Sequence, residues 1–189
     1  TLSPPPSAPL TACALPACTL VAAGTSSAFA QDLENTLYLD LSYGRVVIQL
    51  RPDVAPQTVA RIKELARQGF YDGTPFHRVI PGFMAQGGDP TGTGTGGSGK
   101  RLEAEFSAVK HVRGTVSMAR SSDVNSADSQ FFICFAPAPH LDGQYTAFGQ
   151  VVEGMEFVDR IKKGDPGDNG LVSAPQDRIV KMQVAADAQ

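Results

Sequence analysis

The order of apolar and polar residues predicts strands at both ends of the chain. In 36–41 every second residue is a leucine, as expected for a strand with one buried face. The β-branched stretch 45–50 follows, and the short turn 42–44 between the two predicts a β-hairpin. Near the C-terminus, 178–184 alternates in the same way and predicts a last strand.

The apolar spacing becomes helical after Pro56, a residue that suits the first turn of a helix. Charged side chains fall on the opposite face, and Gly69 supplies a C-terminal stop. A second helix is predicted over 155–162, with Gly164 after it. The apolar positions expected to face inward are Val59, Ile62, Leu65 and Ala66 in the first helix, and Met155, Val158 and Ile161 in the second.

Short strand-like segments and turns fill most of the chain between these two helices. Many short strands with only two helices predict a mainly β fold, a closed antiparallel β-barrel in which closure removes exposed strand edges. Nineteen glycines and fourteen prolines among 189 residues agree with a loop-rich β protein. The length fits one domain, and no internal repeat is visible.

The formal net charge is −3, the pI is about 5.5, and no long basic run occurs. These features argue against nucleic acid as a partner. No stretch reaches the roughly eighteen consecutive apolar residues of a membrane span, so we expect no membrane association once the leader described next is removed.

The first thirty residues carry no charge. An apolar run, 10–23, is followed by small residues and by Ala28-Phe29-Ala30, the pattern of a signal-peptide cleavage site. The pattern predicts a signal peptide over 1–30 and a mature domain over 31–189. A bacterial protein of this kind is exported to the periplasm.

Two other interpretations of the leader remain. One is a lipoprotein signal ending at Cys18, which is less favoured because Pro16 lies next to the cleavage residue. The other is a disordered tail rich in Pro, Ala and Ser, in which case we expect a cytoplasmic protein. If cleavage follows the small residues, Cys13 and Cys18 leave with the leader, and no intrachain disulfide is possible. We interpret the remaining Cys134, inside an apolar run, as a buried structural thiol.

The candidate chemistry lies in 76–89, which contains one arginine and one glutamine among bulky apolar residues. The segment holds neither a nucleophile with its base nor a cluster of metal ligands. A guanidinium beside an apolar pocket indicates chemistry on a neutral, apolar group without a covalent intermediate, and this points to the prolyl peptide bond. Two further blocks, 129–134 and 141–149, follow in the chain.

With these three blocks in this order, 35–184 resembles the cyclophilins, the peptidyl-prolyl cis-trans isomerases. The resemblance implies a barrel of eight strands with a helix over each end. It also implies an enzyme that isomerises X-Pro bonds in proline-containing polypeptides, without cofactor, metal or ATP. We expect it to act as a monomer.

The resemblance also assigns roles to particular residues. Arg78 matches the family's catalytic arginine, and Gln86 and Phe132 complete the catalytic set. The residues expected to bind substrate are Phe83, Met84, Ala119, Arg120, Gln130, Leu141 and Tyr145.

The physics of the prolyl bond explains why an arginine suits this site. Resonance holds the bond planar, with a barrier of about 18–20 kcal/mol. Twisting the bond localises the nitrogen lone pair, which accepts a hydrogen bond only in that state. A permanently charged guanidinium there stabilises the transition state more than the ground state.

Three positions depart from many family members. Arg120 stands where many carry asparagine, which we expect to alter substrate preference. His140 replaces a tryptophan, and Tyr145 a histidine. Because that tryptophan contributes to binding cyclosporin, we expect weak inhibition by this cyclic peptide.

Other motifs carry no function. The glycine-rich stretch 92–100 spells most of two nucleotide-binding patterns, but it neither follows a buried parallel strand nor opens a helix. We interpret it as a surface loop. His77, His111 and His140 lack the spacing of metal ligands, and we interpret His77 as structural.

One alternative function remains open. The same groove would suit a peptide-binding or chaperone module with little turnover, although a mere binder does not need Arg78. An isomerisation assay on a proline peptide separates the two.

Overall fold

The computed structural model of this protein describes residues 32–188. The predicted leader over 1–30, with Cys13 and Cys18, lies outside these residues. Among the described residues, no helix combines the length and the apolar character needed to cross a bilayer.

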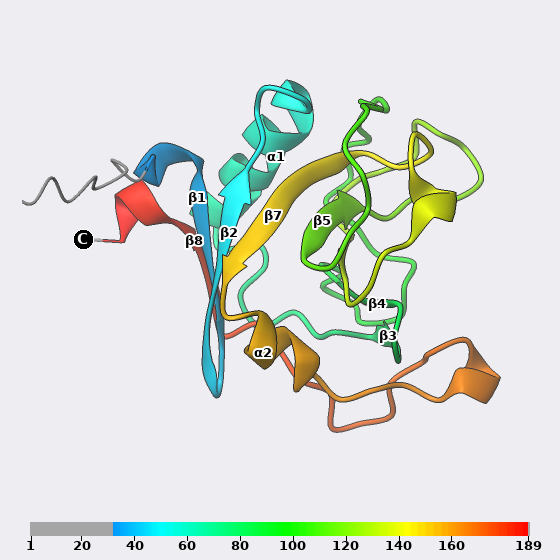
Figure 1. The fold of residues 1–189 in the computed structure, drawn as a ribbon. Helices are drawn as coiled ribbons and strands as arrows, with labels where there is room; N and C mark the ends of the chain where they lie inside the picture. The colour runs from blue at the N-terminus through cyan, green and yellow to red at the C-terminus, as the bar shows by residue number, and fades with distance from the viewer. Residues whose placement is uncertain (1–31, 189) are drawn as a thin grey trace, which may run out of the picture. The chain divides into compact units, whose positions relative to one another are not determined.

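The described chain forms one antiparallel sheet of eight strands, in the order β3-β4-β6-β5-β7-β2-β1-β8. Figure 1 shows the sheet curling from β8, β1 and β2 through β7 towards β5, β4 and β3. The mainly β, eight-stranded antiparallel fold predicted from the sequence is confirmed. The strands are β1 (Thr36–Leu41), β2 (Gly44–Leu50), β3 (Arg78–Ile80), β4 (Met84–Gly87), β5 (Thr115–Met118), β6 (Phe131–Cys134), β7 (Ala147–Glu153) and β8 (Lys181–Val184).

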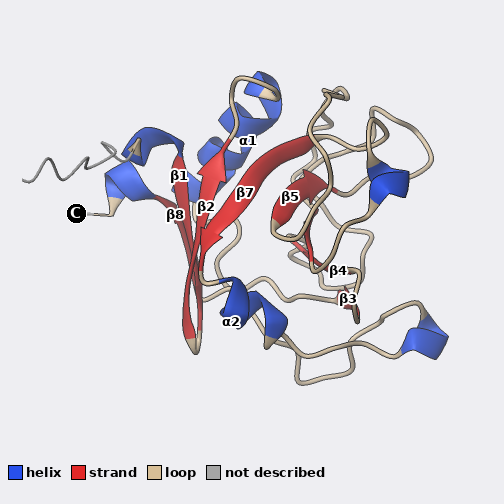
Figure 2. Cartoon of the chain, in the orientation of Figure 1, coloured by secondary structure: helices blue, strands red, loops and turns tan. Residues whose placement is uncertain are grey.

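Two α-helices accompany the sheet, α1 packed against β8 and α2 against β2. The remaining helical segments are single turns, two of them in loops and two directly next to strands (Figure 2). The bounds are α1 (Pro56–Arg67), α2 (Met155–Asp159), and the 3-10 turns η1 (Leu33–Asn35), η2 (Pro139–Leu141), η3 (Pro166–Asp168) and η4 (Ala185–Asp187).

The end of α1 follows the predicted stop. Gly69 has φ +69°, a left-handed conformation in which a glycine is not strained. Its N–H donates to Ala66, and the next N–H, of Phe70, donates to Leu65. These paired bonds satisfy carbonyl groups that the last helical turn leaves open.

Two predicted elements are shorter than expected. The second helix was predicted over 155–162, but α2 ends at Asp159, and the N–H groups of Arg160 and Ile161 bond three residues back. The last strand was predicted from 178, but β8 begins at Lys181. Arg178, predicted as the first residue of that strand, instead pairs with Pro75 in an isolated bridge.

That contact joins the two ends of the curled sheet. The edge strands β3 and β8 are not neighbours in the sheet order. Instead, the segments before them meet: Phe76 N–H donates to Asp177, and Ile179 N–H donates to Thr74. Closure is therefore made by main-chain bonds between loops rather than by a strand pair.

The long connection from β4 to β5 closes over the start of α1. The Glu105 carboxylate in this connection accepts the N–H groups of Gln57 (3.0 Å) and Thr58 (2.9 Å). These donors lie in the first turn of α1, where no helical acceptor exists. A carboxylate there also lies at the positive end of the helix dipole. The loop and the helix are thereby joined.

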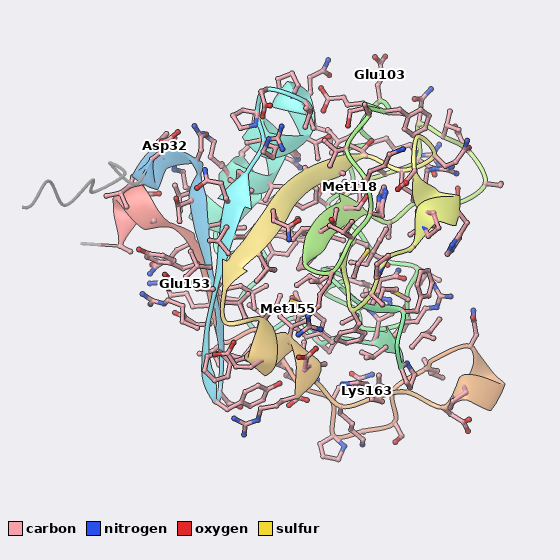
Figure 3. The ribbon with its side chains drawn as sticks, in the orientation of Figure 1. Asp32, Glu103, Met118, Glu153, Met155 and Lys163 are labelled. Carbon is pink, nitrogen blue, oxygen red and sulfur yellow. The ribbon has the colours of Figure 1, made fainter. Side chains whose placement is uncertain are left out.

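We predict that Glu105→Ala lowers the free energy of unfolding by about 1–2 kcal/mol, because it removes a charged cap from the helix start. Urea denaturation measures the change. Glu103→Ala is the matched control, since Glu103 is exposed at the outer end of the same loop (Figure 3). Equal stability of the two variants would show that the cap contributes nothing.

Candidate active site

The site begins with one row of residues across four strands. In the antiparallel register, Arg78 on β3 lies opposite Gln86 on β4, and Gln86 lies opposite Phe132 on β6. Phe132 lies opposite Ser117 on β5. Because side chains alternate across a strand, paired residues in one row share a face of the sheet.

The same alternation gives these strands two apolar faces. Val79, Ala85 and Ile133 belong to the main core, on which Met118 of β5 also packs (Figure 3). Met84, Phe132 and their neighbours form a second, smaller cluster. The apolar runs in the sequence are therefore shared between a structural core and a pocket wall.

The smaller cluster lines a pocket of about 300 Å³. Every predicted site residue except Gln130 lies in its wall, together with His140: Arg78, Phe83, Met84, Gln86, Ala119, Arg120, Phe132, Leu141 and Tyr145. The pocket thus has an aromatic and aliphatic floor with a guanidinium at one side.

Arg78 is held by neutral acceptors. Its Nε donates to the Asn169 carbonyl (3.0 Å), one terminal nitrogen to Asn169 Oδ1 (3.0 Å), and the other to Gln86 Oε1 (3.2 Å). Among residues 32–188, every ion pair involves other basic side chains. No carboxylate neutralises Arg78, so its positive charge remains available to a bound molecule.

Gln86 and Gln130 continue this chain of bonds. Gln86 Nε2 donates to Gln130 Oε1 (2.9 Å). Gln130 Nε2 in turn donates to the carbonyls of Gly94 (3.0 Å) and Gly96 (2.9 Å) in the glycine-rich loop. Gln86 thus connects Arg78 to Gln130. Gln130 supports Gln86 from behind.

The glycine-rich loop is built around the buried carboxylate of Asp89. This group accepts the N–H of Thr91 (2.8 Å) and, on its other oxygen, the N–H of Gly94 (2.6 Å). Burial raises the pKa of Asp89, but the bonds from Thr91 and the loop amides outweigh it and leave the pKa below its ordinary value. A Cβ at Gly96 would overlap this carboxylate. The loop's glycines therefore serve a structural purpose.

Gln130 also lines a second cavity of about 420 Å³ beside the first. The two cavities share Gln86, Ala119 and Arg120. Arg120 lies over the Tyr145 ring (4.5 Å from its centroid) and donates to the Gln144 carbonyl. The residue therefore stands between the two cavities.

Three further residues discussed from the sequence are His77, His140 and Cys134. His77 is buried, and burial lowers its pKa; both ring nitrogens lack a partner within residues 32–188. His140 is exposed and lies 5.4 Å from the Phe83 ring, between centroids. Cys134 is buried as predicted, and burial raises the pKa of its thiol to about 12. No group of three or more His, Cys, Asp or Glu side chains in the described chain could hold a metal ion.

Asn169 is the site residue that sequence reasoning missed. The segment 164–172 (orange in Figure 1) lies along β3: the N–H of Val79 donates to Gly170 and that of Gly164 to Val79. Asn169 has φ +53°, which asparagine tolerates better than most residues. Asparagine before glycine marks a turn in the sequence, but the pattern gives no sign of its contact with Arg78.

Comparison with known proteins identifies the family. The family model described as "Cyclophilin type peptidyl-prolyl cis-trans isomerase/CLD" matches residues 36–184. A Brucella suis protein named "Probable peptidyl-prolyl cis-trans isomerase" is 51% identical over 192 residues, which cover 95% of this chain and 96% of the relative. Isomerase B of Bacillus subtilis is 47% identical over 123 residues, 64% of this chain and 85% of the relative.

Solved structures agree with this result. A Cryptosporidium parvum cyclophilin-type isomerase, crystallised in the presence of the dipeptide Ala-Pro, superposes with a TM-score of 0.72 at 31% identity. The match covers 79% of this chain and 98% of that one. The eight-stranded antiparallel sheet, the apolar pocket and the arginine beside it agree with a prolyl-bond isomerase of this family. The chain belongs to the cyclophilin-type peptidyl-prolyl cis-trans isomerases, and it shares their activity.

We predict that Asn169→Gly lowers kcat/KM about fivefold, because one hydrogen bond to Arg78 is lost while the backbone keeps its left-handed conformation. Asn169→Ala should lose the same bond and also destabilise the fold by about 1 kcal/mol, since alanine is strained at positive φ. Steady-state kinetics and urea denaturation measure the two effects separately. Full activity in both variants would show that Asn169 does not orient the arginine.

Proposed function

We propose that Arg78 is the catalytic group of this isomerase and that the adjacent pocket holds the proline ring of polypeptide clients. The observation that carries the proposal is a guanidinium with only neutral partners beside an apolar pocket. The Ala-Pro dipeptide present with the Cryptosporidium parvum relative supports a proline residue as the occupant.

Different residues of the pocket wall contact different parts of the bound peptide. Phe83, Met84, Phe132 and Leu141 offer apolar surface to a compact ring that has no N–H to satisfy. Ala119 and Arg120 border the neighbouring cavity, on the side proposed for the residue before proline, and Tyr145 forms the far wall. With the ring fixed, rotation about the prolyl bond moves the preceding carbonyl.

Arg78 acts on the twisted state. In the planar amide the nitrogen lone pair is delocalised and accepts no hydrogen bond. In the twisted amide it is localised, and a guanidinium N–H then stabilises it. Each 1.4 kcal/mol of this preference raises the rate about tenfold. Gln86 and Asn169 fix the guanidinium in advance, so little reorganisation accompanies the reaction.

One feature supports catalysis over a chaperone or binding module with little turnover. Neutral acceptors hold Arg78 in one orientation, which binding of an apolar ring does not require.

We also propose that the protein acts as a monomer. The support is that residues of one chain form the whole wall of the pocket.

We predict that Arg78→Ala lowers kcat/KM for an Ala-Pro peptide about 100- to 1000-fold, because one transition-state donor is lost. Peptide affinity should change little, since the apolar wall remains. NMR exchange spectroscopy measures the cis–trans rate, and a peptide titration measures affinity.

Arg45→Ala is the matched control. Arg45 also lies on a strand, but it pairs with Asp40 on the surface (2.6 Å), so its loss should leave turnover unchanged. If wild type and Arg78→Ala were equally inactive yet both bound the peptide, the binding module would be the correct function.

We also propose that the protein is exported. The support is the uncharged leader with its apolar run and small-residue cleavage pattern. Prolyl isomerisation takes tens to hundreds of seconds uncatalysed, slow enough to limit the folding of secreted proteins.

We predict a mature N-terminus at Gln31 in protein purified from its host. Signal peptidase cleaves after the small residues of the A-x-A pattern, so the mass should match a chain that begins at Gln31. Intact-protein mass spectrometry checks this. Recovery of the uncleaved chain from the cytoplasm would refute export.

A further inference from the structure

A row of polar side chains lies directly behind the pocket, with His111 and Ser117 buried and Asp142 partly exposed. The Asp142 carboxylate is 3.1 Å from His111 Nδ1, and the same oxygen accepts the His111 main-chain N–H (2.7 Å). On the other side of the ring, His111 Nε2 is 3.0 Å from Ser117 Oγ. His111 and Ser117 are 1% and 0% exposed.

The partners fix the state of the imidazole. An ionised carboxylate only accepts, so Nδ1 carries the proton and donates to Asp142. Nε2 is then the acceptor, and the Ser117 hydroxyl donates to it. Within residues 32–188 this is the only hydrogen bond of that hydroxyl.

The row has the composition of a hydrolase triad, but its position rules out that chemistry. Ser117 lies on β5 with no exposed surface, opposite Phe132 in the sheet register. No substrate reaches its oxygen, so the row serves to hold the imidazole in place.

The imidazole supports a wall of the pocket. The Phe132 ring stacks on His111 at 6.2 Å between centroids and 20° between planes. Its other neighbour, Tyr145, meets it edge-on at 5.9 Å. The His111 carbonyl also accepts the N–H of Ala138, which precedes the turn that carries Leu141. His111 therefore supports Phe132 through its ring and the turn of Leu141 through its main chain, and only the first contact depends on the imidazole.

We propose that His111, braced by Asp142 and Ser117, is a positioning residue of the isomerase, which in its neutral form holds Phe132 against the proline ring. The inference rests on the proposed role of this pocket. A protonated imidazole would turn Nε2 into a donor and leave the buried Ser117 hydroxyl without its acceptor.

The surroundings keep His111 neutral at pH 7. Burial lowers its pKa; the bond to Asp142 opposes this effect, and nearby His140 adds to it. Lys110 lies 3.7 Å from the other oxygen of Asp142. Cys134, in the same cluster, is neutral because burial raises its pKa to about 12. The neutral imidazole of His111 is therefore the form that supports Phe132, and protonation at low pH removes this form.

The experiment compares His111→Ala with His111→Gln, using a blocked Ala-Pro tetrapeptide without titratable groups. The glutamine amide reaches the place of Nε2 and can accept from Ser117, but it does not titrate. We expect His111→Ala to lower kcat/KM about ten- to a hundredfold and to raise KM, and His111→Gln to recover most of the loss. Equal losses in the two variants would overturn the proposal.

The pH profile supplies the second measurement. In wild type, kcat/KM should fall along the NMR titration of His111, about tenfold per pH unit below its pKa. His111→Gln should abolish this decline. Asp142→Asn should move it to lower pH, because the carboxylate raises the pKa of His111. His140→Gln, the control, should keep the decline but move it to slightly higher pH, because His140 lowers the pKa of His111. Activity that stays constant while His111 titrates would refute the proposal.

His111 could stay neutral until the fold is lost, which circular dichroism would show. The pH profile of kcat/KM must then be flat, and the comparison of His111→Ala with His111→Gln alone tests the proposal.

Failure of the proposed role of Arg78 can be distinguished from failure of this inference. Peptide affinity, measured without turnover, should still fall in His111→Ala and recover in His111→Gln, whereas Arg78→Ala should leave it unchanged. Unchanged affinity in His111→Ala would overturn the inference whatever the activity of Arg78→Ala.

Discussion

The site depends on the antiparallel register of β3, β4 and β6. This register places Arg78, Gln86 and Phe132 side by side in one row, on the face of the sheet that the main core does not use. A slip of one residue in any of these strands would turn its side chain into the core. The main core fixes the register through Val79, Ala85 and Ile133, so packing on one face determines the chemistry on the other.

The second requirement is electrostatic. If Arg78 is the catalytic group, as we propose, it must be held firmly without losing its charge to a carboxylate. Here amide and carbonyl oxygens hold it, and the chain of bonds continues through Gln130 to the glycine-rich loop. The carboxylates of this region are occupied elsewhere, since Asp89 organises the loop and Asp128 accepts from Ser98 and Gly99. Negative charge therefore shapes the surroundings of Arg78 without neutralising it.

The loops therefore support the site as well as connecting the strands. The glycine-rich loop supports Gln130, the segment 164–172 supplies Asn169, and the Glu105 carboxylate attaches the long connection to α1. Beneath the pocket, the Asp142–His111–Ser117 row supports Phe132 in the same manner. Apart from the His111–Ser117 bond, these contacts join residues distant in sequence.

The sequence by itself determined most of the periodic elements and the residues that line the pocket. Alternation predicted β1, Pro56 and Gly69 marked the two ends of α1, and the three blocks, with Ala119 and Arg120 between the first two, predicted the pocket residues. These features depend on local backbone preference and on the order of motifs, and both can be read from the amino-acid sequence. Only the tertiary structure decided that α2 and β8 are short, that loops close the barrel, that Asn169 bonds to Arg78 and that His111 stacks on Phe132. Such contacts depend on which distant segments meet, and no local pattern encodes that.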